Sequence, residues 1–155
     1  MIVYRLTSAR FPKCDGEGAR LYGGRWNSQG RAVVYTAGTQ SLAALEILAH
    51  ASALGDDYVV VGIEIPGALA IEEIELRSLP DWHIATTRSI GDAWFARRAS
   101  AVLRVPSKVI AAEFNYILNP THDDFGQLTI YDPEPFRFDQ RLLERFMGLP
   151  YRVVD

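Results

Sequence analysis

Along the chain, apolar residues occur mostly in short runs separated by polar residues, a pattern typical of strands. Runs rich in Val, Ile and aromatic residues are bounded by Gly or Pro, which separate one strand from the next. The expected strands are residues 2–7, 32–36, 57–65, 101–105, 108–112, 128–131 and 136–138. Residues 8–24 predict a glycine-bearing loop, and residues 69–83 give no clear assignment.

Two longer segments have helical patterns. The clearer one covers residues 41–54, where Thr39 or Ser41 can cap the N-terminus and Gly55 ends the helix. Its apolar side chains point in nearly every direction, so we expect this helix to be buried on most sides. The second segment, residues 86–98, has a single apolar side.

Short strands with a few helices and no regular strand–helix–strand repeat predict an α+β domain. We expect a compact single domain over residues 1–155, with short, mostly antiparallel strands. No glycine-rich fingerprint joins a strand to a helix, so the sequence does not predict a Rossmann fold. A dinucleotide would have to be held in another way.

Composition excludes several classes of protein. The net charge of −3 argues against direct binding of nucleic acid, because proteins that grip the phosphate backbone carry a basic face. Cys14 is the only cysteine, which fits a reducing compartment. The chain begins without a signal-peptide pattern, and its longest apolar run, residues 58–63, is only strand-sized. We therefore expect a cytoplasmic protein that does not enter membranes.

The helix at 41–54 carries the most informative polar pair. Its only ionisable side chains are Glu46 and His50, which lie four residues apart and therefore on one face. A carboxylate in an apolar helix needs a partner or a polar cavity, because burying it unpaired costs several kcal/mol. The sequence leaves two interpretations open: a structural Glu46–His50 pair, or a functional carboxylate.

Three further segments offer groups for binding a ligand. Paired glycines at 23–24 let the backbone approach a ligand closely, and Arg25 offers a planar set of donors suited to phosphate or carboxylate. Tyr35, at the end of a predicted strand, is either packing or a surface on which a cationic aromatic ring can stack. Ser107 is either a turn residue or a polar site residue, and no nucleophile-elbow motif surrounds it.

The three histidines and one cysteine show no metal-ligand spacing, so we expect no metal.

Taken together, these pieces resemble the RES domain family, which is named for its arginine, glutamate and serine. The resemblance runs from about residue 4 to residue 141 and leaves residues 147–155 unmatched. The blocks that carry it are GGRWN at 23–27, Tyr35, SLAALE at 41–46, PS at 106–107 and NYILNP at 115–120. It implies a fold similar to ADP-ribosyltransferases, in which NAD⁺ is a substrate and no prosthetic group is needed.

The resemblance also implies a reaction: cleavage of the nicotinamide–ribosyl bond of NAD⁺, with arrest of growth. Nicotinamide leaves as a neutral base from a cationic glycoside, so the ribose passes through an oxocarbenium-like state that a carboxylate can stabilise. The implied catalytic set is Glu46, Arg25, Tyr35 and Ser107. Arg25 would hold the pyrophosphate, Tyr35 would stack near nicotinamide, and Ser107 would hydrogen-bond the substrate. Orienting groups of second rank are Asn27, Asn115 and Arg5.

Other functions remain open at this point. The acceptor of the ribosyl group can be water, phosphate or a protein side chain, so a protein ADP-ribosyltransferase is the alternative within the same class. A non-catalytic nucleotide-binding or interaction module is the alternative from a different class, and a nuclease is disfavoured by the acidic balance. The family further implies a toxin–antitoxin pair, with a cognate antitoxin that contains a helix-turn-helix DNA-binding part and covers the active site.

Overall fold

The computed structural model describes residues 1–51, 54–55, 57–79, 81–146 and 148. Within these residues, eight strands form one sheet in the order β4-β5-β6-β2-β1-β3-β7, and β8 also pairs with β3. The strands are β1 Ile2–Ser8, β2 Val34–Ala37, β3 Tyr58–Glu64, β4 Ile71–Glu73, β5 Val102–Pro106, β6 Phe114–Leu118, β7 Thr129–Ile130 and β8 Glu134–Phe136. All paired strands run antiparallel except β4 and β5. The α+β class with mostly antiparallel strands agrees with the prediction from the sequence.

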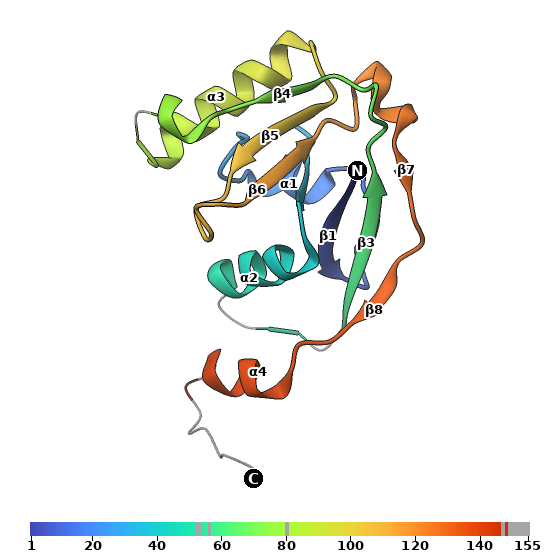
Figure 1. The fold of residues 1–155 in the computed structure, drawn as a ribbon, viewed down its shortest axis with the longest axis vertical. Coiled ribbons are helices and arrows are strands. Elements are labelled where there is room, and N and C mark those ends of the chain that lie inside the picture. The colour runs from blue at the N-terminus through green and yellow to red at the C-terminus, as the bar shows by residue number, and fades with distance from the viewer. Residues whose placement is uncertain (52–53, 56, 80, 147, 149–155) are drawn as a thin grey trace.

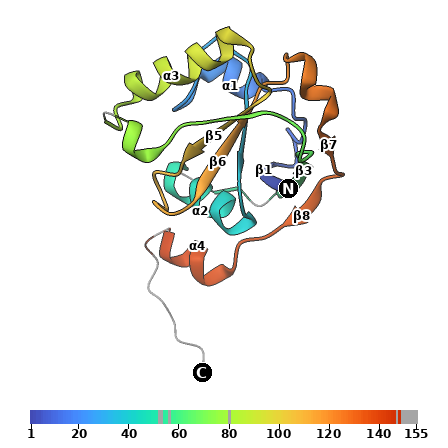
Figure 2. The same cartoon turned by 45° about the horizontal axis from the view of Figure 1, so that its top comes forward.

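Four helices flank the sheet in the described part of the chain (Figure 1). They are α1 Glu17–Tyr22, α2 Gln40–His50, α3 Ile84–Arg97 and α4 Gln140–Phe146, with 3₁₀ turns at Leu76–Ser78 and Asp123–Gln127. Helices α1 and α3 lie at one end of the domain and α4 at the other (Figure 2). No helix of the described residues is both long enough and apolar enough to cross a bilayer.

Helices α2 and α3 pack on the same face of the sheet, over different halves of it. Leu42 of α2 packs with Leu6 of β1, whereas Trp94 of α3 packs with Ile117 of β6. The register shows that Leu6 and Ile117 share a face. Ile117 lies opposite Tyr35 of β2, and Ala37 of β2 lies opposite Tyr4 of β1, and residues two apart on a strand point the same way. Val3, Val61 and other alternate residues form a separate core on the opposite face. The two helices therefore leave a space between them on the shared face.

Helix α2 differs from its prediction in length and burial. Thr39 caps its N-terminus, because the Thr39 hydroxyl accepts a hydrogen bond from the Leu42 N–H at 3.0 Å. The helix ends at His50 rather than residue 54, since the next residue has an extended backbone; residues 52–53 lie outside the described part. Burial on most sides was wrong, because the helix rests on the sheet by one side only. Leu45 is 39% exposed.

The predicted strand at 108–112 was also wrong, and the cause is the side chain of Ser107. Its hydroxyl accepts hydrogen bonds from the N–H groups of Val109 and Ile110, at 3.0 and 3.1 Å. This local bonding turns the chain after β5, so the partner strand β6 starts only at Phe114. The sequence also predicted no strand where β6 forms. The remaining differences are smaller: α1 lies inside the predicted loop, β4 and a 3₁₀ turn occupy the unassigned segment, and β8 ends at Phe136.

Candidate active site

A cavity of about 580 Å³ opens on the shared face of the sheet, between α2 and the loop that follows α1. Its wall combines aromatic rings with a few charged and amide groups. The polar and aromatic residues that line it include Tyr4, Tyr22, Arg25, Tyr35, Glu46, His50, Tyr58, Lys108 and Asn115. A mostly apolar hollow with a few convergent polar groups is the usual form of a small-molecule site.

The carboxylate of Glu46 is held through one of its two oxygens. Oε1 accepts hydrogen bonds from the Ser107 hydroxyl at 2.9 Å and from the Asn115 amide at 2.6 Å. Both donors come from the β5–β6 hairpin, 61 and 69 residues away from Glu46 in the chain. The Glu46 side chain is 22% exposed and lines the cavity. Oε1 thus supplies the support. Within the described part of the chain no side chain donates a hydrogen bond to Oε2, so this oxygen can accept one from a group that enters the cavity.

His50 contributes little to holding this carboxylate. Its Nδ1 lies 2.8 Å from the backbone carbonyl oxygen of Glu46, which can only accept a hydrogen bond, so Nδ1 is the donor. The same nitrogen is 3.6 Å from Oε2, and the His50 side chain is 59% exposed. The purely structural Glu46–His50 pair therefore does not explain where Glu46 sits. Its main partners are Ser107 and Asn115.

Ser107 lies behind Glu46 and is only 1% exposed. Its single O–H is donated to Glu46, while its oxygen accepts the two N–H groups of the following turn. Because the hydroxyl is fully engaged, this geometry makes Ser107 a support for the carboxylate and leaves it no proton for a substrate. Asn115 does reach the cavity, where its Oδ1 is buried without a hydrogen-bond partner.

Arg25 and Tyr35 line the same cavity as Glu46. The Arg25 guanidinium donates to the Trp82 carbonyl at 3.0 Å and lies 6.0 Å from the centre of the Trp82 ring. The Tyr35 hydroxyl accepts from the Trp26 N–H at 2.9 Å and donates to Asn27 Oδ1 at 2.7 Å. Its ring is thereby fixed beneath the loop at 23–28. Gly24 permits this approach, since a Cβ there would lie 2.4 Å from the Tyr35 oxygen.

The comparison with known families bears on this arrangement. The family model of the RES domain matches residues 2–139. The chain belongs to the RES domain family. The three residue types in the family's name meet here, because Arg25 and Glu46 line one cavity and the Ser107 hydroxyl donates to Glu46.

Curated relatives of this RES-family chain are toxins. It is 38% identical to "Toxin Res" of Photorhabdus laumondii, over 93% of this chain and 98% of the relative. It is 37% identical to "Toxin Res" of Yersinia enterocolitica, over 92% and 99%. It is 32% identical to the "Prs ADP-ribosylating toxin" of a Sphingobium species, over 90% and 94%. These likenesses identify the chain as a RES-domain toxin.

A solved structure shows the same fold. A chain in the crystal structure of the M. tuberculosis MbcT–MbcA toxin–antitoxin complex matches with a TM-score of 0.71 and 19% identity, over 96% of this chain and 87% of that one. The expected α+β, ADP-ribosyltransferase-like fold class is thereby confirmed.

Two of the predicted orienting residues do not line the cavity of this RES domain. Asn27 is buried, and its amide nitrogen, which carries two protons, lies within hydrogen-bond distance of three backbone carbonyls of α1 and the surrounding loop. Arg5 alternates with the cavity-lining Tyr4 along β1 and so points to the opposite face, toward Cys14. Burial there lowers the pKa of Arg5 and raises the pKa of the Cys14 thiol.

Sequence reasoning missed other lining residues of the RES cavity. Tyr4 and Tyr58 could have been found by carrying strand alternation through β1 and β3 once Glu46 was chosen as the centre. Lys108 gave no signal, because it was placed in a strand that does not form. Across the described residues, no three His, Cys, Asp or Glu side chains gather as a metal site would require.

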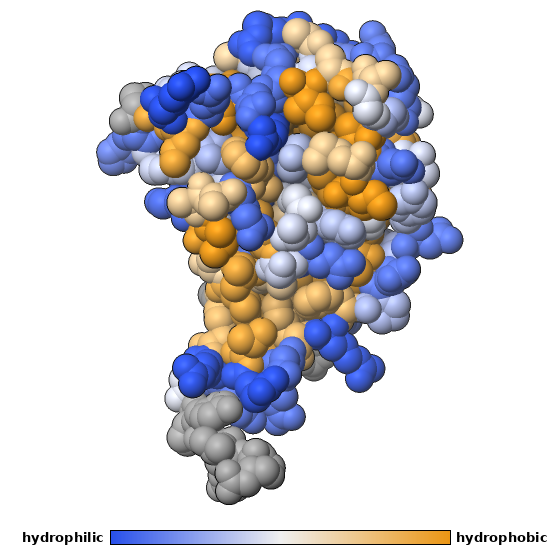
Figure 3. All heavy atoms as spheres, in the orientation of Figure 1, coloured by the Kyte–Doolittle hydropathy of each residue, from blue (hydrophilic) through white to orange (hydrophobic). Residues whose placement is uncertain are grey.

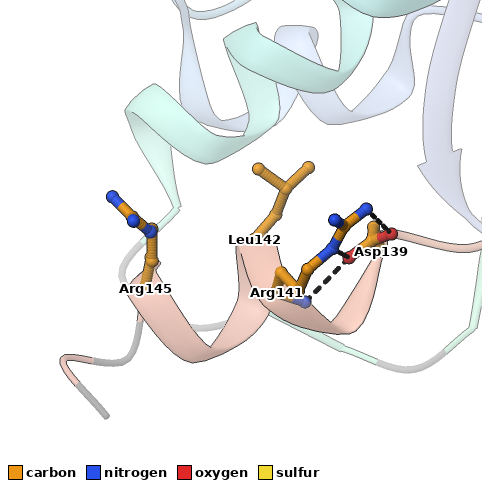
Figure 4. A pocket seen from close by; sticks show the side chains of 4 residues that line it. All are labelled: Asp139, Arg141, Leu142 and Arg145. Atoms are coloured by element: carbon orange, nitrogen blue, oxygen red, sulfur yellow. Dashed lines mark hydrogen bonds and ion pairs between the residues drawn. The ribbon is translucent and has the colours of Figure 1, made fainter. Parts of the chain in front are cut away.

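A second hollow of about 320 Å³ lies beside α4 (Figure 4). It is lined by Asp139, Arg141, Leu142 and Arg145, which come from one short segment. Arg141 makes two hydrogen bonds of 2.9 Å to the Asp139 carboxylate, which holds the pKa of that carboxyl at about 2. Figure 4 shows Leu142 pointing toward α2. In the space-filling view, apolar side chains gather over α2 and toward α4 (Figure 3). This hollow lacks the convergence of distant residues seen in the main cavity.

Tyr35→Phe tests whether the Tyr35 hydroxyl supports the loop at 23–28, because that contribution to stability should depend on pH. Burial raises the pKa of Tyr35 to about 12, from an ordinary value of 10.0. The neutral phenol is the favoured folded form, so its contribution is complete below pH 10 and is lost as the pH rises from 10 toward 12. We expect Tyr35→Phe to lower the free energy of unfolding by about 1–3 kcal/mol at pH 7, because Trp26 N–H and Asn27 Oδ1 lose their partner. Above pH 10, the free energy of unfolding of the parent should fall toward that of the variant.

Denaturant titrations from pH 7 to 11.5 measure this effect. The control is Tyr131→Phe, which removes a hydroxyl bonded to Glu64 at the surface and is expected to change stability at pH 7 by less than about 0.5 kcal/mol. Equal stability of the parent and Tyr35→Phe at pH 7 would contradict a supporting role for the phenol.

Proposed function

We propose that this chain is an enzyme that cleaves the nicotinamide–ribosyl bond of NAD⁺ by hydrolysis or phosphorolysis, and that loss of NAD⁺ arrests growth. The carrying observation is the carboxylate of Glu46, fixed through Oε1 by two donors while Oε2 is left for the cavity. Such a group is already oriented before the substrate arrives. It therefore needs no rearrangement when positive charge develops near it.

The chemistry follows from the charge of the reacting group. Nicotinamide in NAD⁺ carries a positive charge, and breaking its bond to ribose moves that charge onto the ribosyl carbon and ring oxygen. Oε2 of Glu46 can accept a hydrogen bond from a ribose hydroxyl and stabilise this cation electrostatically. The bonding pair leaves with nicotinamide, and an acceptor oxygen then attacks the ribosyl carbon and loses its proton.

The rest of the cavity suits the rest of the dinucleotide. Arg25 and Lys108 place two cationic side chains on the wall, where a pyrophosphate can be neutralised. The ring of Tyr35 offers a stacking surface for the cationic nicotinamide. Tyr4 and Tyr58 add aromatic area on the β1–β3 side. NAD⁺ enters this scheme as the substrate, and no bound prosthetic group is needed.

We further propose that a cognate antitoxin covers this cavity. The matching solved structure is a toxin–antitoxin complex, which supports such a partner. An antitoxin with a helix-turn-helix DNA-binding part would give the pair contact with DNA, whereas this acidic chain itself would not bind nucleic acid.

Transfer of ADP-ribose to a protein is the second candidate, because a 32% identical relative is named an ADP-ribosylating toxin. The two reactions share the cleavage step and differ only in the acceptor. A non-catalytic nucleotide-binding module is disfavoured, since Arg25, Tyr35 and Glu46 all remain on the cavity wall.

The deciding experiment incubates the purified protein with NAD⁺, with and without inorganic phosphate, and identifies the products. We expect nicotinamide together with ADP-ribose, or with phosphorylated ADP-ribose when phosphate is the acceptor. Expression without antitoxin is then expected to lower the cellular NAD⁺ pool as growth stops. Growth arrest with an unchanged NAD⁺ pool and labelled protein would instead support ADP-ribosylation, and binding without any turnover would support the non-catalytic module.

A further inference from the structure

We propose that helix α3 positions Arg25 for ligand binding, and that Thr87 is the central positioning residue. This rests on the proposed function, in which Arg25 holds the NAD⁺ pyrophosphate. Neither Thr87 nor its helix lines the cavity, so the effect on the ligand has to pass through Arg25. Helix α3 acts on the two peptide groups on either side of the Arg25 Cα atom.

Helix α3 holds the carbonyl oxygens of both peptide groups. The fully buried Thr87 hydroxyl donates to the Arg25 carbonyl at 2.7 Å. The Arg88 guanidinium donates through Nε to the Gly24 carbonyl at 2.6 Å. Thr87 also lies 3.3 Å from two carbonyls of its own helix, but a hydroxyl has one proton, and the shortest contact is the one to Arg25.

The peptide that follows Arg25 is held from its other side as well. Its N–H, that of Trp26, donates to the Tyr35 hydroxyl. The plane of this peptide is thus fixed by Thr87 at its oxygen and by Tyr35 at its nitrogen. With the preceding peptide held by Arg88, the direction of the Arg25 Cα–Cβ bond is determined.

Helix α3 also approaches the loop too closely for a side chain. Gly91 faces Trp26, and a Cβ there would lie 1.8 Å from the Trp26 carbonyl oxygen. At the next residue, the Asp92 carboxylate accepts hydrogen bonds from both the N–H and the hydroxyl of Ser28, at 2.9 and 2.6 Å. A glycine inside a helix costs about 1 kcal/mol relative to alanine, so its presence here fits a requirement for close packing.

The far end of Arg25 is fixed by the segment that leads into α3. Its guanidinium donates to the carbonyl of Trp82, two residues before the helix begins at Ile84. The backbone of Arg25 is thereby anchored to α3, and its side-chain tip to the residues directly before α3. A long arginine side chain loses considerable rotamer freedom when it binds a ligand, and anchoring it beforehand removes part of that entropy cost.

The test is Thr87→Val, which keeps the shape of the side chain and removes the hydroxyl. We expect the KM for NAD⁺ to rise about 3- to 10-fold, the effect of one neutral hydrogen bond, with kcat changed less than about 2-fold. Thr87→Ser restores the donor and should restore KM. The matched control is Thr129→Val on the exposed strand β7. All variants are assayed at a temperature where melting curves show them folded.

A second background separates positioning from a general loss of order. In the Arg25→Ala protein, Thr87→Val should produce no further rise in KM, because the residue through which it acts is gone. An unchanged KM in folded Thr87→Val, or an equal rise in the Arg25→Ala background, would overturn the proposal.

Hydrogen exchange gives a readout that does not depend on NAD⁺ turnover. Thr87→Val should speed exchange of the amides at 24–28 and leave those of α2 unchanged. If the parent protein neither binds nor cleaves NAD⁺, the proposed function is wrong, but the positioning role of α3 is not yet contradicted. The exchange rates at 24–28 then decide whether α3 positions the loop. Unchanged exchange at 24–28 in Thr87→Val would overturn the positioning role as well.

Discussion

Glu46→Gln should lower the rate of nicotinamide release from NAD⁺ by about 10²–10³-fold, or about 3–4 kcal/mol in the transition state. The structure makes this substitution unusually selective. Glutamine keeps an oxygen that can accept both hydrogen bonds now received by Oε1, from Ser107 and Asn115. Only the other position changes, from a charged acceptor to a neutral amide donor. We therefore expect the variant to stay folded, to bind NAD⁺ and to lose toxicity.

Three measurements check this expectation: thermal melting, NAD⁺ binding by calorimetry and the rate of nicotinamide release. Glu64→Gln is the control, because that carboxylate on β3 bonds to Tyr131 at the surface and does not line the cavity. If folded Glu46→Gln cleaves NAD⁺ within a few-fold of the parent rate, Glu46 is a structural residue and the proposed mechanism fails.

The sequence predicted the glutamate of this site but not its partners. Helical periodicity places only nearby residues on one face, so it offered His50, four positions along. The actual partners come from the β5–β6 hairpin, more than 60 residues away. Such contacts arise from tertiary packing and leave no local pattern. Only the order of blocks shared with the RES family brought Glu46, Ser107 and Asn115 into one hypothesis.

The fold was predictable where strands are long and regular. The ladder between β1 and β3 follows the expected boundaries within one residue, because each strand contains β-branched and aromatic residues and β3 ends just before Pro66. The segment after β5 failed, since a single hydroxyl, that of Ser107, diverted the backbone from a strand into a turn. Helix α1 was missed because it is only six residues long and follows Gly16 in a left-handed conformation, which reads locally as a loop.

The role of α3 was hidden for a similar reason. Its apolar side was visible in the sequence, but Thr87 and Asp92 look like ordinary surface residues of a helix. The one available signal was Gly91 in the middle of a helical pattern, which often marks close packing against another segment. That signal says that something lies close to the helix, and it does not say what.

Arg25→Ala is expected to change the opposite kinetic parameter from Glu46→Gln. Charge-assisted hydrogen bonds to a phosphate contribute about 1.5–3 kcal/mol, so we expect KM for NAD⁺ to rise about 10- to 100-fold. The pyrophosphate keeps its charge through bond cleavage, so ground state and transition state lose the same interaction and kcat should change little. Arg25→Lys should fall between the two, since lysine keeps the charge but loses the planar pair of donors. Steady-state kinetics measures both parameters.

The dependence on salt adds a second criterion for Arg25. If its charge binds the dinucleotide, KM of the parent should rise with ionic strength more steeply than KM of Arg25→Ala, because one screened ion pair is missing from the variant. Arg97→Ala serves as the control. Arg97 pairs with Glu72 and does not line the cavity. A fall in kcat at unchanged KM would place Arg25 at the reacting ribose instead of the pyrophosphate. NAD⁺ would then have to bind in the reverse orientation. Lys108, the other cationic side chain in the proposed pyrophosphate site, would bind the phosphates.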